Sequence, residues 1–386
     1  MPSDLNSLPE AASLQGLRIA IVHEWFVNHA GSEKVVEQML QVFPQADVFA
    51  LVDFLPEKRR AYLGGKPVST SFVQRLPFAR RHFRNYFFLF PMAVESHDLR
   101  KYDIILSSSH MVSKGLICNQ NQLHISYCHS PCRYAWDLYH QYLEEAGLST
   151  GLKGRLAQYF LHKLRIWDFI STQRVGHFLA NSAYIGRRIA HVYNRPSDVL
   201  YPPVDVESFS LQAQKGDYYF AASRLVPYKK MDIIAQAFQQ MPDKKLVLVG
   251  SGKDELNIRR FAAPNIEFQT EASNADFLRW MSGAKAFVFA AEEDFGITMA
   301  EALACGTPVI AFGRGGACEI VEDGRSGILF PEQTAESVKA AVLRFEKDGL
   351  ALSAEAISAS ARRFSIANFR QGLARFVREK WEQFKA

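Results

Sequence analysis

Hydrophobic residues along this chain come in short runs, separated by longer stretches in which apolar positions recur with helical spacing. The first run, Leu17–His23, is rich in β-branched residues, and a glycine-containing loop and the periodic stretch Glu33–Phe43 follow it. This order predicts a buried strand, a loop and a helix. Further strands are predicted in the first half at Asp47–Val52, Tyr102–Ser107, Leu123–Cys128 and His177–Ala180. Helical patterns between them, including Lys153–Val175, indicate a parallel sheet covered by helices on both faces.

The same alternation restarts after Tyr201-Pro202-Pro203, whose two prolines stiffen the backbone as in a linker. The second half has predicted strands at Tyr218–Ala222, Lys245–Val249, Asn265–Phe268, Ala286–Ala290 and Pro308–Phe312. Its predicted helices are Met231–Gln240, Asp254–Phe261, Asn274–Ser282 and Thr298–Cys305, and the end of the chain is helical, with an amphipathic helix at Phe364–Phe384. We therefore expect an α/β protein with two Rossmann-like, doubly wound domains facing a central cleft, since such sheets bind ligands at the carboxyl ends of their strands.

These patterns divide the chain into four parts. A polar tail, residues 1–16, precedes a first domain at 17–203, a second domain at 204–365 and a terminal helix at 366–386.

Composition and charge narrow the class of protein. The 386 residues are 48% hydrophobic and 22% charged, as in ordinary globular proteins. A net charge of +5 favours anionic ligands or an anionic membrane surface and is too small to indicate a nucleic-acid-binding protein. Five cysteines without a CxxC pair suit a reducing compartment. With no signal-peptide pattern and no apolar run of the ~20 residues that span a bilayer, we expect a cytoplasmic protein, soluble or peripheral to the membrane.

Two basic residues follow the first predicted strand of the second half. Arg224 and Lys229 share the short segment Ser223–Lys230. A diphosphate is well bound by a forked donor together with a mobile point charge, and Arg and Lys supply these. The alternative is a solvated basic loop before a helix.

A second motif, Glu292–Glu301, follows the predicted strand Ala286–Ala290. Phe295-Gly296-Ile297 is expected at a loop-to-helix junction, where free backbone N–H groups and the helix dipole suit a phosphate, and Gly296 allows close approach. Glu293 before the helix and Glu301 within it are candidate acceptors for sugar hydroxyls. The alternative is an acidic loop and a surface glutamate on the helix.

Three glycine-containing segments remain. Gly31, after the first strand, either closes on the same phosphate or simply precedes a helix capped by Ser32. Gly250-Ser251-Gly252 approaches a ligand or only turns the chain. Gly313-Arg314-Gly315-Gly316 does not have the spacing of a dinucleotide-binding fingerprint. The acidic run Glu292-Glu293-Asp294 has no Asp-x-Asp spacing, so we predict no metal site.

In combination these motifs resemble a known family. The Arg224 and Lys229 pair, the Glu293 and Glu301 element and the following Ala302–Ile310 look like the retaining family-4 glycosyltransferases with the GT-B fold. The resemblance extends from about Leu17 to the end of the chain. It implies an acceptor-side first domain, a second domain that binds a nucleotide sugar, and a terminal helix that returns to the first domain.

The resemblance also implies roles for individual residues. Arg224 and Lys229 would bind the donor diphosphate, Glu301 the nucleotide ribose, and His129 would lie beside the transferred sugar. The implied catalytic set is His129, Arg224, Lys229 and Glu293, and the implied donor-binding set is Gly31, Arg224, Lys229, Glu293, Phe295, Gly296, Ile297 and Glu301. Taken outside the family, His129 is better explained as a buried structural histidine. No cofactor is implied, and no metal is required.

Two segments narrow the resemblance. Tyr127–Asp137 and Tyr201–Asp205 look like the bacterial WbaZ-like mannosyltransferases, which implies transfer of α-mannose from GDP-mannose to a glycan acceptor in surface or exopolysaccharide synthesis. The resemblance also implies that the nucleotide base is recognised near Phe268–Ser273. There Gln269-Thr270-Glu271 stands where many relatives have glycine, which leaves a UDP-sugar donor open. A nucleotide-sugar 2-epimerase and a non-catalytic nucleotide-sugar-binding subunit also stay open as functions.

The acceptor side has one distinctive segment. Arg75–Pro91 concentrates basic and aromatic residues, which suits either an anionic membrane interface or a core of aromatics beneath a solvated Arg face. A polyprenyl-diphosphate-linked acceptor would be found at the inner face of the cell membrane. A nucleic-acid partner is not expected, because the basic cluster is single and short.

Overall fold

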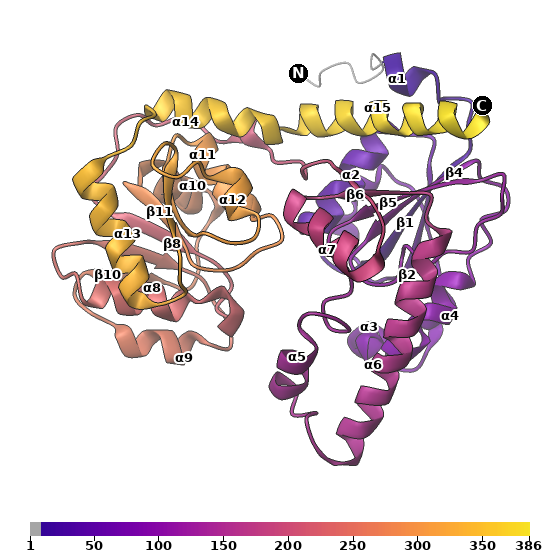
Figure 1. Ribbon diagram of the computed structural model, residues 1–386, viewed down its shortest axis with the longest axis horizontal. Coiled ribbons are helices and arrows are strands. Elements are labelled where there is room, and N and C mark those ends of the chain that lie inside the picture. The colour runs from indigo at the N-terminus through magenta and orange to yellow at the C-terminus, as the bar shows by residue number, and fades with distance from the viewer. Residues whose placement is uncertain (1–8) are drawn as a thin grey trace. The chain divides into compact units, whose positions relative to one another are not determined.

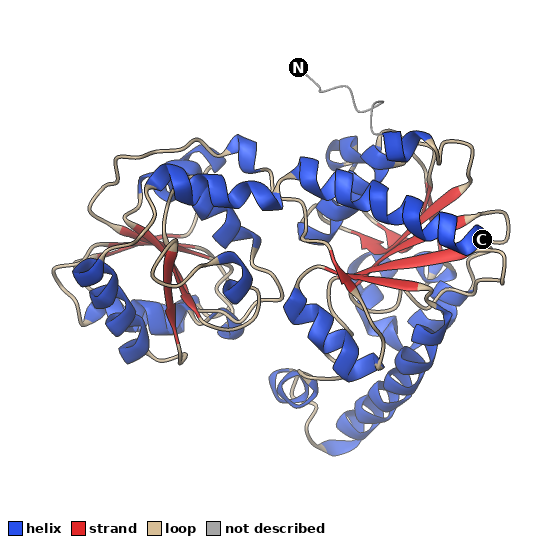
Figure 2. Cartoon of the chain, turned by 45° about the horizontal axis from the view of Figure 1, so that its top comes forward, coloured by secondary structure: helices blue, strands red, loops and turns tan. Residues whose placement is uncertain are grey.

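The computed structural model describes residues 9–386, and the chain divides into two compact units. The first unit extends to Pro203 and includes Phe369–Ala386, and the second unit is Val204–Asn368. Residues 1–8 of the predicted polar tail lie outside the described residues. Each unit is a parallel sheet flanked by helices (Figures 1 and 2).

The first sheet has seven strands in the order β3-β2-β1-β4-β5-β6-β7, all parallel. The strands are β1 (Ile19–Phe26), β2 (Asp47–Asp53), β3 (Val68–Thr70), β4 (Ile104–Ser109), β5 (Leu123–Cys128), β6 (His177–Ala180) and β7 (Asp198–Val199). Strands β1, β4 and β5 are buried on both faces, which explains their continuous apolar runs.

Helices cover both faces of this sheet. They are α1 (Pro9–Ala12), α2 (Gly31–Val42), α3 (Ala79–His82), α4 (Phe90–Glu95), α5 (Tyr139–Glu145), α6 (Gly151–Ser171), α7 (Ala183–Tyr193) and most of α15 (Ile366–Lys385). One core cluster joins α2 and α15 to the sheet through residues such as Val35, Leu373 and Val377. A second cluster, which includes Phe83, Phe90 and Leu164, lies against α4 and α6.

The second sheet has six parallel strands in the order β10-β9-β8-β11-β12-β13. The strands are β8 (Tyr219–Ala222), β9 (Leu246–Val249), β10 (Ile266–Gln269), β11 (Ala286–Phe289), β12 (Val309–Phe312) and β13 (Gly327–Phe330). The helices are α8 (Met231–Gln239), α9 (Glu255–Ile258), α10 (Asn274–Gly283), α11 (Ile297–Ala304), α12 (Ala317–Ile320), α13 (Ala335–Asp348) and α14 (Ala354–Ser360).

The two sheets share one winding scheme. In each, the first strand of the unit lies in the middle, the next two strands add on one side, and the later strands add on the other. The winding direction therefore reverses between β1 and β4 and between β8 and β11, the positions at which such sheets bind ligands. The predicted α/β architecture of two Rossmann-like units is confirmed.

Short elements are where the structure differs from the predicted pattern. Strands β3, β7 and β13 were not predicted. Strands β3 and β7 have three and two residues and are not buried, and β13 is a four-residue run that begins with glycine. Within the segment interpreted as a polar tail, Pro9–Ala12 form α1 and Leu14 is buried in the core of the first unit. A single apolar residue among polar ones, such as Leu14, gives no periodic pattern, so its burial could not be predicted from the sequence.

Candidate functional site

The loop after β8 holds Arg224 at the carboxyl end of the central strand of the second unit. Nη2 of Arg224 donates a hydrogen bond to the Tyr228 hydroxyl at 2.7 Å. Tyr228 belongs to a single 3-10 turn, Pro227–Lys229. This turn begins with proline, whose fixed φ suits the first position of a helical turn. The guanidinium is therefore held at one edge of the sheet by its own loop.

Lys229 and Glu293 connect two loops across the point where the winding reverses. Nζ of Lys229 donates a hydrogen bond to Oε1 of Glu293, so the loop after β8 is joined to the loop after β11. Both side chains are largely buried, with 15% and 22% of their surface exposed. The ring centroid of Phe289, at the end of β11, lies 5.8 Å from the Lys229 ammonium nitrogen. The structure thus brings together two residues that are 64 positions apart in sequence.

Close glycine packing holds the Glu293 loop in place. The Gly316 N–H donates to the Glu293 carbonyl at 2.9 Å. A Cβ at Gly315 would lie 2.2 Å from that carbonyl oxygen, and one at Gly316 would lie 2.1 Å from the Phe295 carbonyl oxygen. Gly315 also has a φ of +67°. The glycines of Gly313–Gly316 therefore serve chain packing, in keeping with their lack of a dinucleotide-binding spacing.

The Gly250–Gly252 segment supports Arg224 in the same way. A Cβ at Gly250 would lie 2.0 Å from the Ser223 carbonyl oxygen, and one at Gly252 would lie 2.2 Å from that of Leu225. The Leu225 N–H donates to the Ser251 carbonyl at 3.0 Å. The structure therefore shows this segment packing against the arginine loop.

Gly296 is the residue before α11 and has a φ of +96°, a conformation that favours glycine. The first turn of α11 follows it, and no described side chain caps this turn. The Phe295 side chain is buried and lies edge-on against Phe364, with ring centroids 5.2 Å apart. Phe295 can therefore offer a ligand its backbone but not its ring. Glu301 lies within α11 and is partly buried.

In the first unit, Gly31 is the first residue of α2, directly after the β1 loop. The alternative in which Ser32 caps this helix is wrong. The residue before the helix is Ala30, whose N–H donates to Oε2 of Glu33 at 3.1 Å, and the Ser32 hydroxyl donates to the same oxygen at 3.1 Å. A glutamate at the third helical position thus satisfies the helix start.

Glu33 is buried and carries a low pKa. Burial favours its neutral form, but contact with His23 and the N–H groups of Glu33 and Ala30 outweigh burial and lower its pKa to about 2. Nε2 of His23 lies 3.7 Å from Oε1 of Glu33. A charged carboxylate therefore lies at the start of α2, where it accepts from Ala30 and Ser32 on either side of Gly31.

His129 follows β5 and is connected to that carboxylate by a chain of polar contacts. Nδ1 of His23 lies 3.2 Å from both the carbonyl oxygen and the hydroxyl of Ser108, and the same hydroxyl lies 2.8 Å from Nε2 of His129. A carbonyl oxygen can only accept, so Nδ1 of His23 carries a proton. We infer that the Ser108 hydroxyl accepts from it and donates its own hydrogen to Nε2 of His129. His129 therefore carries its ring proton on Nδ1.

The charge state of His129 follows from its surroundings. Burial, with the neighbouring His110 and His23, lowers its pKa well below the usual value, so the ring is neutral at pH 7. His129 is half-buried, and its backbone is fixed by hydrogen bonds to Ser109 and Asn181. We call His23, Glu33, Ser108 and His129 the polar chain of the first unit.

Sequence reasoning singled out His129 and Gly31 and missed the residues between them. The signal was present, because polar residues end two otherwise apolar strands: His23-Glu24 near the end of β1, and Ser107–His110 at the end of β4. Glu24 is fully buried and accepts backbone N–H bonds from residues 110–113 through one oxygen. Buried polar groups at strand ends must have partners, so these runs mark a structured edge of the sheet.

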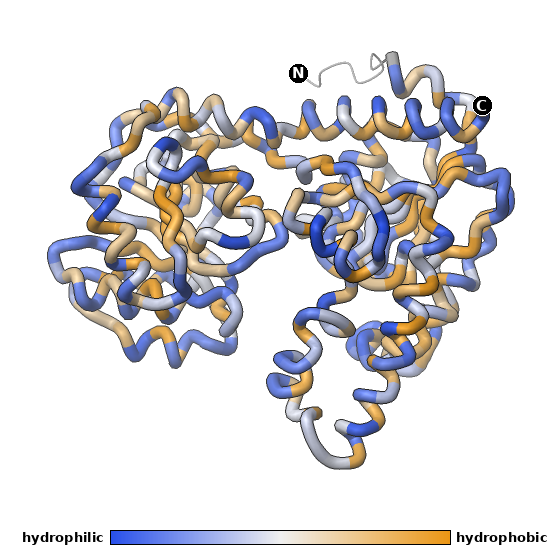
Figure 3. Tube along the Cα trace, viewed as in Figure 1, coloured by the Kyte–Doolittle hydropathy of each residue, from blue (hydrophilic) through white to orange (hydrophobic). Residues whose placement is uncertain are grey.

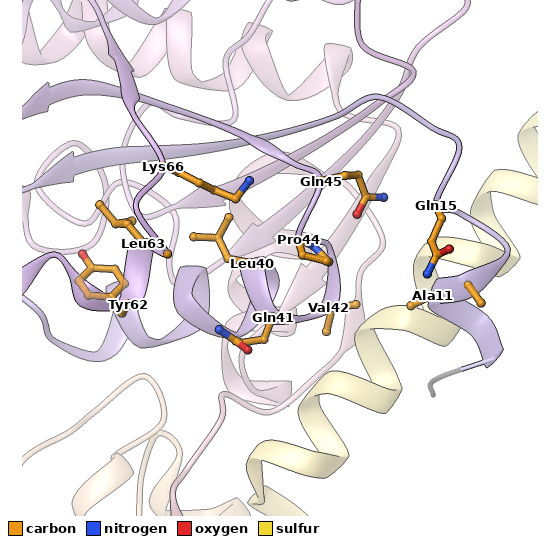
Figure 4. A pocket seen from close by; sticks show the side chains of 12 residues that line it. Ala11, Gln15, Leu40, Gln41, Val42, Pro44, Gln45, Tyr62, Leu63 and Lys66 are labelled. Atoms are coloured by element: carbon orange, nitrogen blue, oxygen red, sulfur yellow. The ribbon is translucent and has the colours of Figure 1, made fainter. Parts of the chain in front are cut away.

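A cavity of about 410 Å³ lies elsewhere in the first unit (Figure 4). It is bounded by α1, the end of α2, the segment before β2 and the loop Tyr62–Lys66. None of the predicted site residues lines it.

Within residues 9–386, no three His, Cys, Asp or Glu side chains are grouped as a metal ion needs. None of the helices in the same range is both long and apolar enough to cross a membrane.

Comparison with known proteins agrees with this geometry. Residues 204–364, nearly the whole second unit, match the family described as glycosyl transferases group 1. The matched range contains Arg224, Lys229, Glu293 and Glu301.

Two curated relatives share part of the chain. A GDP-mannose-dependent monoacylated α-(1-6)-phosphatidylinositol monomannoside mannosyltransferase from Corynebacterium glutamicum is 38% identical over 114 residues, which cover 26% of this chain and 30% of the relative. A D-inositol 3-phosphate glycosyltransferase from Jonesia denitrificans is 33% identical over 159 residues, covering 35% and 38%. The chain thus spans about a third of the length of these relatives.

Solved structures show the fold over nearly the whole chain. The Anabaena protein HepE, solved in complex with UDP and glucose, superposes with a TM-score of 0.66 at 18% identity, covering 94% of this chain and 99% of that one. The predicted GT-B fold is confirmed by this likeness and by the two strand orders.

Proposed function

We propose that this protein is a retaining glycosyltransferase that transfers a hexose, α-mannose from GDP-mannose, to a lipid-linked glycan acceptor. The observation that carries the proposal is the pairing of Lys229 with Glu293 across the reversal point of the second sheet. Arg224 lies on the same loop as Lys229, and the start of α11 follows Glu293. Two cations and a helix start at one sheet edge are suited to a diphosphate, and the adjacent carboxylate is suited to sugar hydroxyls.

The chemistry follows from the charges that develop. As the bond between the anomeric carbon and the diphosphate oxygen breaks, negative charge grows on the leaving nucleoside diphosphate and positive charge on the sugar ring. Arg224, Lys229 and the backbone before α11 stabilise the leaving group. An acceptor hydroxyl forms the new bond on the same face of the sugar, and its proton passes to the departing phosphate oxygen. Configuration at the anomeric carbon is thereby retained, and the proposed step uses no metal or cofactor.

The first unit contributes Gly31 and His129 in this proposal. The N–H groups at the start of α2, beside Gly31, suit the diphosphate, and the Nδ1–H of His129 is a donor for an oxygen of the transferred sugar. A neutral histidine suits this role, because it donates a hydrogen bond without adding charge beside a developing positive centre. We also propose a cytoplasmic location, supported by the sparse cysteines without a CxxC pair.

The observations that bear on the donor nucleotide disagree: one set favours GDP and another favours UDP. The Corynebacterium relative is named for GDP-mannose, and the motifs around Tyr127–Asp137 agree with it. HepE was solved with UDP and glucose, and Gln269-Thr270-Glu271 occupies the predicted base-binding segment here. The second candidate is therefore the same transferase with a UDP-sugar donor.

Calorimetric titration of the full chain with GDP, UDP and ADP, in buffer containing EDTA, tests the proposal directly. We expect tight binding of GDP and weak binding of UDP and ADP. Preferred binding of UDP would keep the site and replace the donor. Binding that appears only when Mg²⁺ is added would contradict a metal-independent site. If none of the three nucleotides binds, the proposed donor site is wrong.

Variants then connect binding to turnover. Arg224→Ala and Lys229→Ala are each expected to lower turnover of GDP-mannose by about 10²–10³-fold while the chain stays folded, because each removes one charge from the leaving-group site. Lys230→Asn is the matched control: Lys230 is the next residue, with a φ of 54° that asparagine tolerates, and it has no assigned role. Near-normal turnover in both alanine variants would overturn the assignment.

A further inference from the structure

Helix α6 has two apolar faces, and only one of them is used by the fold. Its inner face contributes Leu161 and Leu164 to the core of the first unit. The buried carboxylate of Asp168 on the same face accepts hydrogen bonds from Lys114, from Trp136 at 2.8 Å and from Tyr193 at 2.9 Å. The core-facing side of α6 is therefore fully occupied by contacts within the first unit.

The other face carries a second, exposed apolar stripe. Leu152, Leu156 and Ile170 have 85%, 55% and 58% of their surface exposed. With Tyr159 and Ile166, which are also exposed, they recur at spacings of three, four and seven residues, which places them on one side of a helix. A helix of 21 residues is roughly 30 Å long, and α6 extends well past the edge of the sheet (Figures 1 and 3).

The exposed charges on α6 are all positive. Lys153, Arg155 and Lys163 are exposed, and Lys163 lies within the apolar stripe, 5.5 Å from the Tyr159 ring centroid. Asp168 is the only acid in Gly151–Ser171, and it is buried. The acids Glu144 and Glu145 lie on the preceding helix, α5.

The stripe continues onto the basic aromatic segment of the first unit. The Phe160 ring of α6 lies 5.0 Å from the ring of Phe88, which follows α3. Phe78 and Met92 of the same region are 81% and 58% exposed. Residues 75–94 contain no acid, and their exposed charged residues are Arg75, Arg80, Arg81 and Arg84. Within this segment Phe83 and Phe90 are buried in the core, whereas Phe88 and the four arginines are exposed.

We propose that α6 and residues 75–92 form one interfacial surface that binds an anionic lipid bilayer. Leucine, isoleucine and aromatic side chains would enter the region between headgroups and acyl chains, while the lysines and arginines contact lipid phosphates. This surface goes beyond the proposed function, since it needs no nucleotide and no acceptor. It would place a lipid-linked acceptor within reach of the first unit.

The charges decide between a bilayer and a second copy of this chain. Two copies packed stripe to stripe would bring Lys163 of each chain, and the arginines around it, into an interface without an exposed carboxylate on α6 to neutralise them. Desolvating unpaired cations is costly, whereas a negatively charged membrane surface attracts each of them.

Cosedimentation of the full chain with vesicles tests the proposal. We use vesicles of phosphatidylglycerol and phosphatidylcholine in equal parts, and vesicles of phosphatidylcholine alone, at low ionic strength. We expect pelleting with the first kind only, and weaker pelleting when salt is raised. Leu156→Ser combined with Ile170→Ser, and separately Lys153→Glu combined with Lys163→Glu, should each lower the partition coefficient by about 10-fold or more.

Matched controls keep the test specific. Leu256→Ser changes a leucine that is 82% exposed in the second unit, and Lys58→Glu with Arg59→Glu reverses two exposed charges elsewhere in the first unit. Both controls should pellet like the parent chain. The proposal is overturned if the parent does not pellet, if it pellets equally with phosphatidylcholine alone, or if the controls lose as much. It is also overturned if sedimentation velocity shows a dimer that the α6 variants dissociate. Unchanged nucleotide binding in every variant separates this outcome from a failure of the donor site.

Discussion

The ring proton of His129 is set by residues that no ligand needs to touch. Ser108 holds one nitrogen of this histidine and His23 contacts Ser108, while Glu33 lies beside His23 and accepts the Ala30 N–H before α2. A short row of polar side chains thus links the histidine proposed to lie beside the sugar with the loop proposed to meet the diphosphate. The function of an imidazole depends on which nitrogen carries the proton, and that is decided by the hydrogen bond at the other nitrogen.

Ser108→Ala tests this at the residue scale. Without the hydroxyl, Nε2 of His129 loses its donor, so we expect the ring proton to leave Nδ1 in a measurable fraction of molecules. Turnover should fall about fivefold to tenfold, the worth of one hydrogen bond. The tautomer is read from the ¹⁵N shifts of the labelled imidazole, a signal that general loosening of the fold would not produce.

Ser126→Ala is the control for this change. Ser126 is a buried serine on the neighbouring strand β5, and its hydroxyl has no hydrogen-bond partner among residues 9–386. Loss of the Ser126 hydroxyl should leave the ¹⁵N chemical shifts of the His129 imidazole unchanged. If the Ser108 variant also leaves them in place, the hydrogen-bond direction inferred for the polar chain is wrong.

At the scale of elements, glycine loops from neighbouring strands hold the loops that carry the charges. The segment after β9 packs on the Arg224 loop, and the segment after β12 packs on the Glu293 loop. These glycines touch backbone rather than ligand, and their lack of a side chain is what lets adjacent loops come close enough to share hydrogen bonds. The charged residues are placed by their neighbours as much as by their own strands.

Gly315→Ala should therefore damage donor binding without touching a ligand. Its Cβ would lie 2.2 Å from the Glu293 carbonyl oxygen, so the loop that carries Glu293 must shift. We expect the affinity for the preferred nucleotide to fall by about 10-fold or more, measured by calorimetry, as is usual when supporting groups around a site are disturbed.

Gly64→Ala separates this clash from backbone strain. Gly64 is left-handed, with a φ of +60° and a ψ of +31°, but a Cβ there meets no atom of the described residues within 4 Å. Both variants share the cost of a left-handed alanine, about 1–2 kcal/mol, and only the first has the clash. Equal nucleotide affinities in the two variants would show that the packing of Gly315 does not control the site.

At the scale of the whole molecule, the chain does not keep its two units separate along the sequence. It completes the second unit at Asn368 and then adds α15 to the first, where Phe369, Leu373 and Val377 are buried in the core. The first unit is thus not complete until the end of the chain has been made. Its stability depends on residues more than 160 positions away from Pro203, at the end of its main segment.

Phe369→Ala should destabilise the first unit by about 3–5 kcal/mol, the usual cost of removing a buried phenylalanine side chain. Urea unfolding followed by tryptophan fluorescence reports this unit well, since Trp25, Trp136, Trp167 and Trp381 belong to it and only Trp280 belongs to the second. Phe384→Ala on the same helix is the control, because Phe384 is 37% exposed and outside the core. Equal losses in the two variants would contradict the packing of α15.

The sequence by itself determined the fold class, most of the strands in their order along the chain and the identity of the charged residues near Arg224 and Glu293. It could do so because strands buried on both faces need continuous apolar runs, and because phosphate chemistry needs particular residue types at strand ends. Local patterns of this kind depend only on neighbours along the chain.

Tertiary structure alone decided the remaining features. The pairing of Lys229 with Glu293, the polar chain from Glu33 to His129 and the packing role of the glycines all join residues distant in sequence. The exposed stripe of α6 also needed the tertiary structure. The pattern of apolar residues does not tell which face of the helix is buried, and only the burial of the opposite face shows that this one is exposed. Burial and partnership are properties of the packed chain, and for that reason they could not be predicted from the order of its residues.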